Sequence, residues 1–311
     1  MKLKTKDLLG IKDLSREDIE IIFEVASSFK EVLKRPIPKV PSLRGKTVCN
    51  LFFEPSTRTR SSFELAEKRL SADTLNFSAS TSSITKGETT LDTLKNIAAM
   101  RVDAFVIRHS FSGAAHFLAK YTPASVINAG DGINEHPTQA LLDIYTIKER
   151  KGKTEGLKAL IVGDILHSRV ARSNIFGMLK MGMEVLLCGP PTLLPREFES
   201  IGCKICYKLD EVLKEADVIM ALRVQKERGG KSLIPSFREY RKLYGITSER
   251  LKNIKEDVLI MHPGPINWGV EMDYDVLDLK NNLILEQVEN GVAIRMAVLY
   301  LLIGPGKEEE I

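Results

Sequence analysis

The amino-acid sequence predicts an α/β protein built from two doubly wound parallel-sheet domains, with a C-terminal helix that packs back on the N-terminal domain. Apolar runs of strand length alternate with segments whose apolar residues recur at helical spacing, which is the pattern of parallel strands covered by helices on both faces. The chain has 311 residues, more than one compact core usually contains. A polar, glycine-containing stretch at 151–156 separates two alternating series. We therefore expect domains over residues 1–150 and 151–290.

The first series opens with a helix at about 15–34, for which Ser15 is a suitable N-cap because Glu17 and Asp18 follow in the first turn. Continuous apolar runs then predict strands at 47–53, 104–107 and 125–128. Helical patterns separate these runs, at about 57–70, 88–100, 113–120 and 136–150.

The second series predicts strands at 157–162, 184–187, 217–220 and 258–261. A final helix is expected at about 291–303, and since no strand follows it, we expect the segment 291–311 to return to the first domain. Cys203 and Cys206 form a C-x-x-C within a short apolar alternation, with no second pair or nearby histidine. This context favours a small buried strand over a zinc site, so we expect no metal.

The composition excludes several classes of protein. Hydrophobic residues make up 43% of the chain and charged residues 28%, as in ordinary globular proteins. No stretch reaches the roughly 18 consecutive apolar residues that a membrane-spanning helix needs, and the first residues are of mixed polarity rather than a signal core. We therefore expect a cytoplasmic protein with no membrane partner. The 45 basic and 41 acidic residues are scattered along the chain, so no nucleic-acid partner is expected.

The segment Glu54-Pro-Ser-Thr-Arg-Thr-Arg60 has the features of a phosphate site. It follows a predicted strand and leads into a helix, so that free backbone N–H groups, hydroxyls and guanidinium groups can all donate to an anion. Ser56 alone could simply cap the helix. A cap does not explain Arg58 and Arg60 in the first turn, where cations oppose the helix dipole, so we favour a bound anion.

Polar residues also follow the next two predicted strands. Arg108 ends one of them, and alone it could be a surface residue. The other is followed by a glycine-rich turn that leads to His136, with Pro137 at a suitable first helical position. His136 and Gln139 would share a helix face, and because the anion site is near, we favour a functional role for His136 over a structural one.

In the second series, Gly163-Asp-Ile-Leu-His-Ser-Arg169 joins a strand to a helix but lacks G-x-G-x-x-G, which argues against dinucleotide binding. Arg169 lies near the N-terminus of the predicted helix and Arg223 follows the predicted strand at 217–220, and two such arginines suit bidentate recognition of carboxylates. The Pro263–Pro265 segment predicts a stiff loop whose carbonyl groups face a site. Lys86, in a polar loop, would by itself be interpreted as a solvated side chain.

Together these segments resemble the catalytic chain of aspartate carbamoyltransferases, within the aspartate/ornithine carbamoyltransferase superfamily. The matching segments occur in the family's order along essentially the whole chain: 52–60, 86–88, 108–109, 128–132, 136–139, 163–164, 168–169, 223–228 and 262–265. The resemblance implies two α/β domains, the first binding carbamoyl phosphate and the second binding aspartate. It also implies an early step of de novo pyrimidine biosynthesis, the transfer of a carbamoyl group from carbamoyl phosphate to L-aspartate.

The resemblance also assigns roles to residues. Carbamoyl phosphate would be bound by Ser56, Thr57, Arg58, Thr59, Arg108, His136, Gln139, Pro263, Gly264 and Pro265. Of these, Arg58, Thr59, Arg108 and His136 would be catalytic. L-Aspartate would be bound by Lys86, Arg169, Arg223 and Gln225. Ser82 and Lys86 would come from an adjacent subunit, which implies a homotrimer with shared active sites and no metal or organic cofactor.

Three alternatives are weighed against this interpretation. An ornithine carbamoyltransferase would share the S-T-R-T-R segment, but its acceptor carries a side-chain amine and its motifs typically include S-M-G and H-C-L-P, where this chain has Arg223-Val-Gln225 and His262-Pro-Gly-Pro265. Another amino acid as acceptor, or a non-catalytic scaffold, is less favoured because the site residues are complete. The sequence is compatible with further assembly with a regulatory chain or a dihydroorotase. One departure is Trp268, the only tryptophan, which stands where relatives often have arginine.

Overall fold

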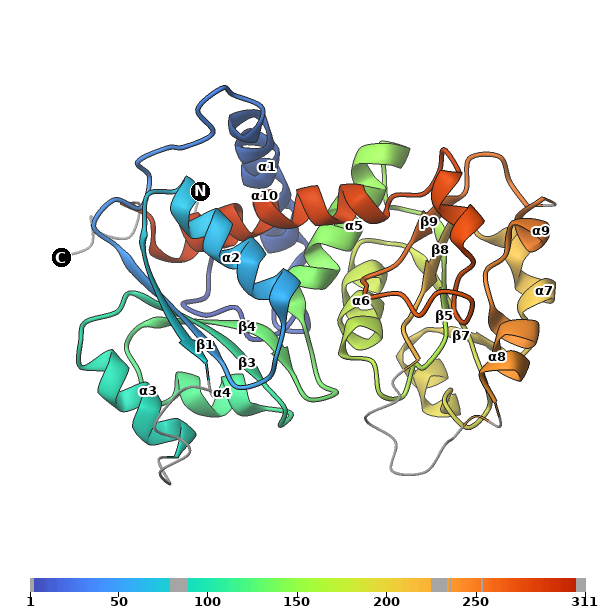
Figure 1. Ribbon diagram of the computed structural model, residues 1–311, viewed down its shortest axis with the longest axis horizontal. Coiled ribbons are helices and arrows are strands. Elements are labelled where there is room, and N and C mark those ends of the chain that lie inside the picture. The colour runs from blue at the N-terminus through green and yellow to red at the C-terminus, as the bar shows by residue number, and fades with distance from the viewer. Residues whose placement is uncertain (1–2, 79–88, 225–233, 235, 253, 306–311) are drawn as a thin grey trace. The chain divides into compact units, whose positions relative to one another are not determined.

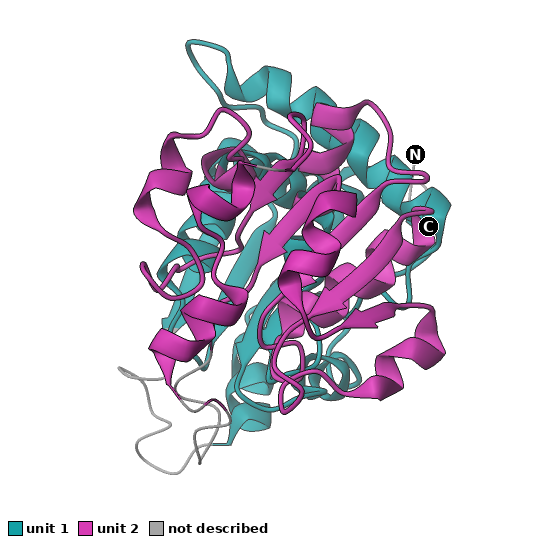
Figure 2. Ribbon diagram, turned by 90° about the vertical axis from the view of Figure 1, so that its right-hand side faces the viewer, with its two compact units in different colours: residues 1–142, 289–311 teal, residues 143–288 magenta. Residues whose placement is uncertain are grey.

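The computed structural model describes residues 3–78, 89–224, 234, 236–252 and 254–305. The chain forms two compact units: unit 1 comprises residues 1–142 and 289–311, and unit 2 comprises residues 143–288 (Figure 2). Each unit has its own parallel sheet with helices packed on it, which confirms the predicted fold class. Among the described residues, none of the helices has the length and apolar character needed to cross a membrane.

Unit 1, as far as it is described, contains a four-stranded parallel sheet in the order β2-β1-β3-β4. Its strands are β1 (Thr47–Phe52), β2 (Asp73–Ser78), β3 (Ala104–His109) and β4 (Ser125–Asp131). Its helices are α1 (Arg16–Leu33), α2 (Thr57–Arg69), α3 (Thr90–Ala98) and α4 (Ala114–Ala119), and α5 (Pro137–Lys151) begins here. Figure 1 shows α1 and α2 on one side of this sheet and α3 and α4 on the other. The sheet is therefore covered on both faces.

The C-terminal helix α10 (Ile284–Ile303) packs on unit 1, as predicted. Its Arg295 donates to the Ser62 hydroxyl at 2.7 Å and lies over the Phe63 ring, and Tyr300 meets Phe29 edge to face. The predicted start at residue 291 is wrong, because the helix begins at Ile284. Its first two turns carry polar side chains such as Gln287. This side chain is buried and hydrogen-bonded to Asp143, so it does not contribute to an apolar pattern in the sequence.

Strand β2 was not expected from the sequence. It lies at the edge of the sheet and pairs only with β1 among the described strands, and its residues from Asp73 to Phe77 are exposed or half-buried. A continuous apolar run marks a strand covered on both faces, and an edge strand needs no such run. The residues from Asp73 to Ser78 alternate between polar and apolar and contain no continuous apolar run, so the strand is not predicted.

Unit 2, within the described residues, contains a five-stranded parallel sheet in the order β7-β6-β5-β8-β9. Its strands are β5 (Lys158–Val162), β6 (Glu184–Cys188), β7 (Lys204–Cys206), β8 (Val218–Ala221) and β9 (Leu259–Met261). Its helical segments are α6 (Arg169–Lys180), η3 (Arg196–Ile201), α7 (Leu209–Val212), η4 (Leu213–Glu215), α8 (Phe237–Tyr244), α9 (Ser248–Leu251) and η5 (Tyr274–Asp278). The small strand expected near Cys203 is present as β7, but it is an edge strand, and only Cys203 of the pair is buried.

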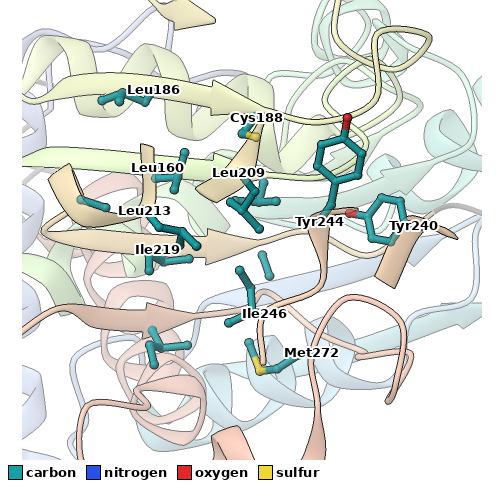
Figure 3. Close-up of a cluster of buried hydrophobic side chains, with 14 of the residues drawn as sticks. Leu160, Leu186, Cys188, Leu209, Leu213, Ile219, Tyr240, Tyr244, Ile246 and Met272 are labelled. Atoms are coloured by element: carbon teal, nitrogen blue, oxygen red, sulfur yellow. The ribbon is translucent and has the colours of Figure 1, made fainter. Parts of the chain in front are cut away.

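One face of the unit 2 sheet packs against α7 and α8 in an apolar cluster (Figure 3). The side chains of Leu160 and Ile219, on the central strands β5 and β8, belong to the same buried cluster as Leu209 of α7. The rings of Tyr240 and Tyr244 lie toward the end of the sheet to which the strand arrows point. This core holds the carboxyl ends of the strands, from which the polar loops emerge.

The order of strands reverses inside each sheet. In unit 1, the chain passes from β1 to β2 on one side and then returns to β3 on the other side of β1. In unit 2, β6 and β7 lie on one side of β5, and β8 and β9 on the other. Loops diverge at such a reversal, and open parallel sheets bind ligands in the crevice that results at the carboxyl ends of the strands. Ligand-binding side chains are therefore expected after β1 and β3 and after β5 and β8.

The buried carboxyl of Glu67, on helix α2, makes the stability of unit 1 dependent on pH. Glu67 is fully buried, where Asn50 Nδ2 donates to its Oε2 at 3.0 Å, and burial raises the pKa of Glu67 to about 7. A carboxyl whose pKa is higher in the folded than in the unfolded chain stabilises the fold at low pH, and that contribution is lost as pH rises through the folded value.

We predict that the free energy of unfolding of the wild type falls, relative to that of Glu67→Gln, between about pH 4.5 and about pH 7. The expected total is on the order of 3 kcal/mol. Chemical unfolding at several pH values, followed by circular dichroism, measures it. Glu64→Gln, on the partly exposed face of the same helix, is the control. A constant difference between Glu67→Gln and the wild type across this range would contradict the prediction.

Candidate active site

The N-terminus of α2 follows β1 and has the features of an anion site. Ser56 is the N-cap residue, yet its side chain makes no capping hydrogen bond, and the first turn contains no acidic residue. By contrast, α1 and α3 each begin with a complete capping box and an acidic side chain. In α2 the helix dipole is therefore not compensated by the chain's own groups, and an anion is the natural complement. Thr57 and Arg58 are exposed there, and Thr59 is buried.

Arg108 lies at the end of β3, directly opposite Phe52 of β1 in the sheet register. Its Nη1 donates to the carbonyl oxygen of Ala129 at 3.1 Å, and its Nη2 lies 3.5 Å from the Glu54 carboxylate. The guanidinium is thereby fixed between the end of β4 and the loop that leads into α2. Its position places a half-buried cation beside the loop that leads into α2, at the strand reversal of unit 1.

The next residue, His109, supports the site instead of entering it. Its ring is buried, and burial lowers its pKa, so the neutral form is favoured. Nδ1 accepts a hydrogen bond from the Phe111 backbone N–H at 3.0 Å, which fixes the turn that follows Arg108.

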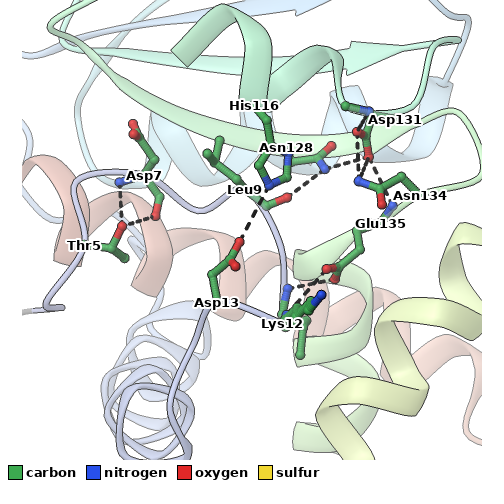
Figure 4. A network of polar contacts seen from close by, with 12 residues as sticks. Thr5, Asp7, Leu9, Lys12, Asp13, His116, Asn128, Asp131, Asn134 and Glu135 are labelled. Carbon is green, nitrogen blue, oxygen red and sulfur yellow. Dashed lines mark hydrogen bonds and ion pairs between the residues drawn. The ribbon is translucent and has the colours of Figure 1, made fainter. Parts of the chain in front are cut away.

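The turn between β4 and α5 is held by two buried carboxylates (Figure 4). Asp131 accepts hydrogen bonds from the Gly113 N–H at 2.6 Å, from Asn128 Nδ2 at 2.8 Å and from the Glu135 N–H at 3.1 Å. Glu135 in turn accepts from the N–H of Ile11 at 2.7 Å. Sequence reasoning missed both carboxylates, although acidic residues in a glycine-rich turn after a buried strand were a usable signal.

His136 follows this rigid turn and is buried. Helix α5 begins at the next residue, Pro137, as the sequence predicted. Gln139 is half-buried one turn further along, and its backbone N–H donates to the His136 carbonyl oxygen at 3.0 Å. Together with Arg108 and the start of α2, these residues collect at the carboxyl edge of the unit 1 sheet.

In unit 2, the loops after β5 and β8 approach each other closely. Gly163 has φ +136°, and a Cβ at this position would lie 3.1 Å from both Leu222 Cβ and the Tyr240 hydroxyl oxygen. Only glycine suits this backbone conformation and this separation. Asp164 is buried and accepts from the His167 N–H at 3.1 Å, which shapes the loop that ends in Arg169.

The two arginines predicted for carboxylate recognition lie at these loops. Arg169 is the first residue of α6 and is buried, next to Ser168, whose hydroxyl caps the helix by accepting from the Ala171 N–H. Arg223 follows β8 by two residues and is half-buried. The predicted site residues Gln225, Ser82 and Lys86 lie outside the described residues.

The Pro263–Pro265 loop after β9 is tied to the helices around it. The His262 N–H donates to Gln287 Oε1 at 3.0 Å, and the Gly264 N–H donates to His262 Nδ1 at 2.7 Å. Gln287 Nε2 donates to Asp143 Oδ1 at 2.7 Å, and the other oxygen of Asp143 accepts from Asn174 at 2.8 Å. Asp143 and Gln287 were not singled out from the sequence.

Each unit therefore offers a different kind of recognition. Unit 1 brings together hydroxyls, guanidinium groups and a helix N-terminus, which suit a phosphate. Unit 2 brings two arginines to neighbouring strand ends, which suits carboxylates. Among the described residues, we find no group of three or more histidine, cysteine, aspartate or glutamate side chains placed to hold a metal ion.

Comparison with known proteins gives matches along the chain. Residues 6–149 match the model of the carbamoyl-P binding domain of aspartate/ornithine carbamoyltransferases, and residues 155–302 match that of the Asp/Orn binding domain. The aspartate carbamoyltransferase catalytic subunit of Syntrophobacter fumaroxidans is 59% identical, over 97% of this chain and 99% of its own. That of Moorella thermoacetica is 57% identical, over 98% of this chain and 99% of its own.

Solved structures agree with these matches. Aspartate transcarbamoylase from Trypanosoma cruzi, in complex with carbamoyl phosphate and aspartate, has a TM-score of 0.88 and 30% identity, over 97% of this chain and 96% of that chain. The catalytic subunit of M. jannaschii aspartate transcarbamoylase has a TM-score of 0.85 and 36% identity, over 98% of this chain and 100% of that chain.

We predict that inorganic phosphate raises the melting temperature of the protein, because a ligand that binds only the folded state stabilises it, by about 2.7 kcal/mol at roughly 100 times its Kd. Arg58→Ala should remove most of this shift. Lys68→Ala, in the last turn of the same helix, should preserve it and is the charge-matched control. The melting temperature is measured in phosphate and in chloride at equal ionic strength. An undiminished phosphate response in Arg58→Ala would argue against the anion site.

Proposed function

Because the chain belongs to the aspartate/ornithine carbamoyltransferase family, we propose that it transfers the carbamoyl group of carbamoyl phosphate to the amine of L-aspartate and releases phosphate. Relatives at 55% to 59% identity are named aspartate carbamoyltransferase catalytic subunits. The observation that carries the proposal is the pair of arginines that follow two neighbouring strands of unit 2: Arg169, at the start of α6 after β5, and Arg223, after β8. A dicarboxylic acceptor requires two such groups.

We assign carbamoyl phosphate to the carboxyl edge of the unit 1 sheet. Its phosphate would take hydrogen bonds from the start of α2, through Ser56, Thr57, Arg58 and Thr59. Its carbonyl oxygen would face Thr59, Arg108 and His136, while Gln139 and the Pro263–Pro265 loop would hold the amide end. The uncompensated helix dipole of α2 supports this assignment, as does the half-buried Arg108, whose guanidinium lies 3.5 Å from Glu54 in the loop that leads into α2.

We assign the two aspartate carboxylates to Arg169 and Arg223, together with Gln225 and Lys86. Carbamoyl phosphate brings about two negative charges and aspartate two more, against the charges of Arg58, Arg108, Arg169, Arg223 and Lys86. Positive and negative charge are therefore nearly matched. Burial strengthens the pairing at Arg169, because a buried charge is screened less by water and salt than an exposed one.

The chemistry needs no nucleophile from the protein. The unprotonated amine of aspartate attacks the carbamoyl carbon, and negative charge develops on the carbonyl oxygen. Arg108, Thr59 and His136 stabilise that charge, and one well-placed donor of this kind contributes roughly 3–4 kcal/mol. The C–O bond to phosphate then breaks, and the departing phosphate accepts the proton of the amine. The protein chiefly orients the two substrates and neutralises their charge.

We further propose a homotrimer in which Ser82 and Lys86 serve the active site of an adjacent subunit, as the family resemblance implies. The name catalytic subunit, carried by the relatives, is consistent with association with another chain. The place in pyrimidine biosynthesis follows from the product, N-carbamoyl-L-aspartate. The expected cytoplasmic location stays a prediction.

The assignment of the acceptor is tested by comparing amino acids. We predict that purified protein with carbamoyl phosphate forms carbamoyl aspartate from L-aspartate, and that L-ornithine reacts at least about 100-fold more slowly, because the arginines repel its side-chain ammonium and leave it without an acidic partner. Product formation is followed by chromatography. Faster reaction with ornithine would contradict the acceptor, and no reaction with either would favour a non-catalytic scaffold.

Shared active sites predict complementation between inactive variants. Lys86→Ala and Arg58→Ala trimers should each have little activity, and mixing them with subunit exchange should restore part of it, because some sites then combine two intact halves. Activity is measured before and after exchange, and native mass spectrometry verifies that hybrids form. Mixing Arg58→Ala with Arg108→Ala, both in the same proposed half-site, is the control that should not recover. Hybrids without activity would rule out sharing through Lys86.

A further inference from the structure

Glu271 is a buried carboxylate beneath the loops that carry the proposed acceptor-binding residues of unit 2. It is 1% exposed and lies in the turn 267–272, after the Pro263–Pro265 loop. We propose that Glu271 is a positioning residue that fixes Arg223 for binding the carboxylates of aspartate. This inference rests on the proposed function.

Both carboxylate oxygens of Glu271 accept hydrogen bonds from donors on two separate loops. Oε1 accepts from the Val224 N–H at 2.9 Å and from Asn267 Nδ2 at 2.8 Å. Oε2 accepts from the Asn267 N–H at 3.0 Å. Val224 follows β8, and Asn267 follows β9, its neighbour in the sheet. Glu271 thus joins the loops that leave two adjacent strands.

The three donors explain why this position requires a carboxylate of this length. A glutamine would present an N–H group to one of the backbone N–H groups, so that one buried donor would lose its acceptor. An aspartate would be shorter by one methylene group and could not reach both loops. Burial raises the pKa of Glu271, while its hydrogen bonds from Val224 and Asn267 act in the opposite direction. The hydrogen bonds from Val224 and Asn267 favour the charged carboxylate and thereby oppose the effect of burial on Glu271.

Glu271 and the sheet hold the two neighbours of Arg223. On one side, the Leu222 N–H donates to the Val162 carbonyl oxygen at 2.8 Å. On the other side, the Val224 N–H donates to Glu271. The backbone at Arg223 is therefore fixed at both of its ends, and the guanidinium extends from a rigid base. Bidentate recognition of a carboxylate depends on such fixed geometry.

The chain has a built-in reporter of this turn. Trp268, the only tryptophan, is adjacent to Asn267 and stacks on the ring of Tyr274, with centroids 4.5 Å apart. It is half-buried against the unit 2 core. Its fluorescence therefore responds to a change in the turn that Glu271 holds, independently of catalysis.

The test is Glu271→Gln, assayed for carbamoyl aspartate formation with each substrate varied in turn. We expect the KM for aspartate to rise roughly tenfold or more with a much smaller change in kcat, the pattern of lost binding common to ground and transition states. The KM for carbamoyl phosphate should change much less, because its phosphate is assigned to unit 1 and the Pro263–Pro265 loop is held separately by Gln287 through His262. Trp268 emission should shift to longer wavelength. Glu184→Gln, at the amino end of β6, makes the same chemical change in an exposed ion pair and should behave as the wild type.

Asn267→Ala serves as the second variant, since it removes one of the three donors from a half-buried residue, and it should raise the KM for aspartate by a smaller factor. A wild type that forms no carbamoyl aspartate would refute the proposed function itself. An active wild type whose KM for aspartate is unchanged in Glu271→Gln would overturn the positioning role. An equal rise in both KM values with a lowered melting temperature would also overturn it, as would an unaffected Asn267→Ala if Glu271→Gln does not fold.

Discussion

The reversal of strand order in each sheet is the constraint on which the candidate site depends. After β1 the chain leaves on one face of the sheet, and after β3 it leaves on the other, so the two loops diverge and expose the strand ends between them. The same holds for β5 and β8 in unit 2. At the first reversal lie the open N-terminus of α2 and Arg108, and at the second lie Arg169 and Arg223. The strand order thus determines where the arginines and the helix N-terminus lie, whichever substrate binds there.

Buried carboxylates hold the loops that emerge from these strand ends. Asp131 and Glu135 accept backbone N–H groups around the turn before His136, Asp143 acts through Gln287 on the Pro263–Pro265 loop, and Glu271 binds the loop of Arg223. Asp131, Glu135 and Glu271 thereby satisfy backbone donors that an irregular loop would otherwise leave buried and unmatched, and Gln287, held by Asp143, does the same for the His262 N–H. The loops are irregular in shape yet rigid, which is what the recognition of small charged substrates requires.

The sequence predicted the parts of the fold and site that leave a local signal. Strands covered on both faces produced apolar runs, and arginines or hydroxyls directly after them were visible by position, as at Thr59 and Arg108. Strand β2 left no such run, because it is an exposed edge. Glu271 and Asp143 also remained hidden, since their partners lie far away along the chain: Val224 and Glu271 are 47 residues apart, and Asp143 and Gln287 are 144 apart. Periodicity reports neighbours within an element and carries no information about such pairs.

The return of α10 to unit 1 has a consequence for the newly made chain on the ribosome. Unit 2 is continuous, from Asp143 to Val288, so all of its residues are synthesised before the C-terminal part of unit 1. Unit 1 includes Glu289–Ile311, and its packing around Phe29 and Phe63 is incomplete until Tyr300 and Arg295 have been added. Domains usually fold in the order of their synthesis. Here the domain that is begun first is completed only after unit 2 has been synthesised, and its core around Phe29 and Phe63 stays partly uncovered until helix α10 is added.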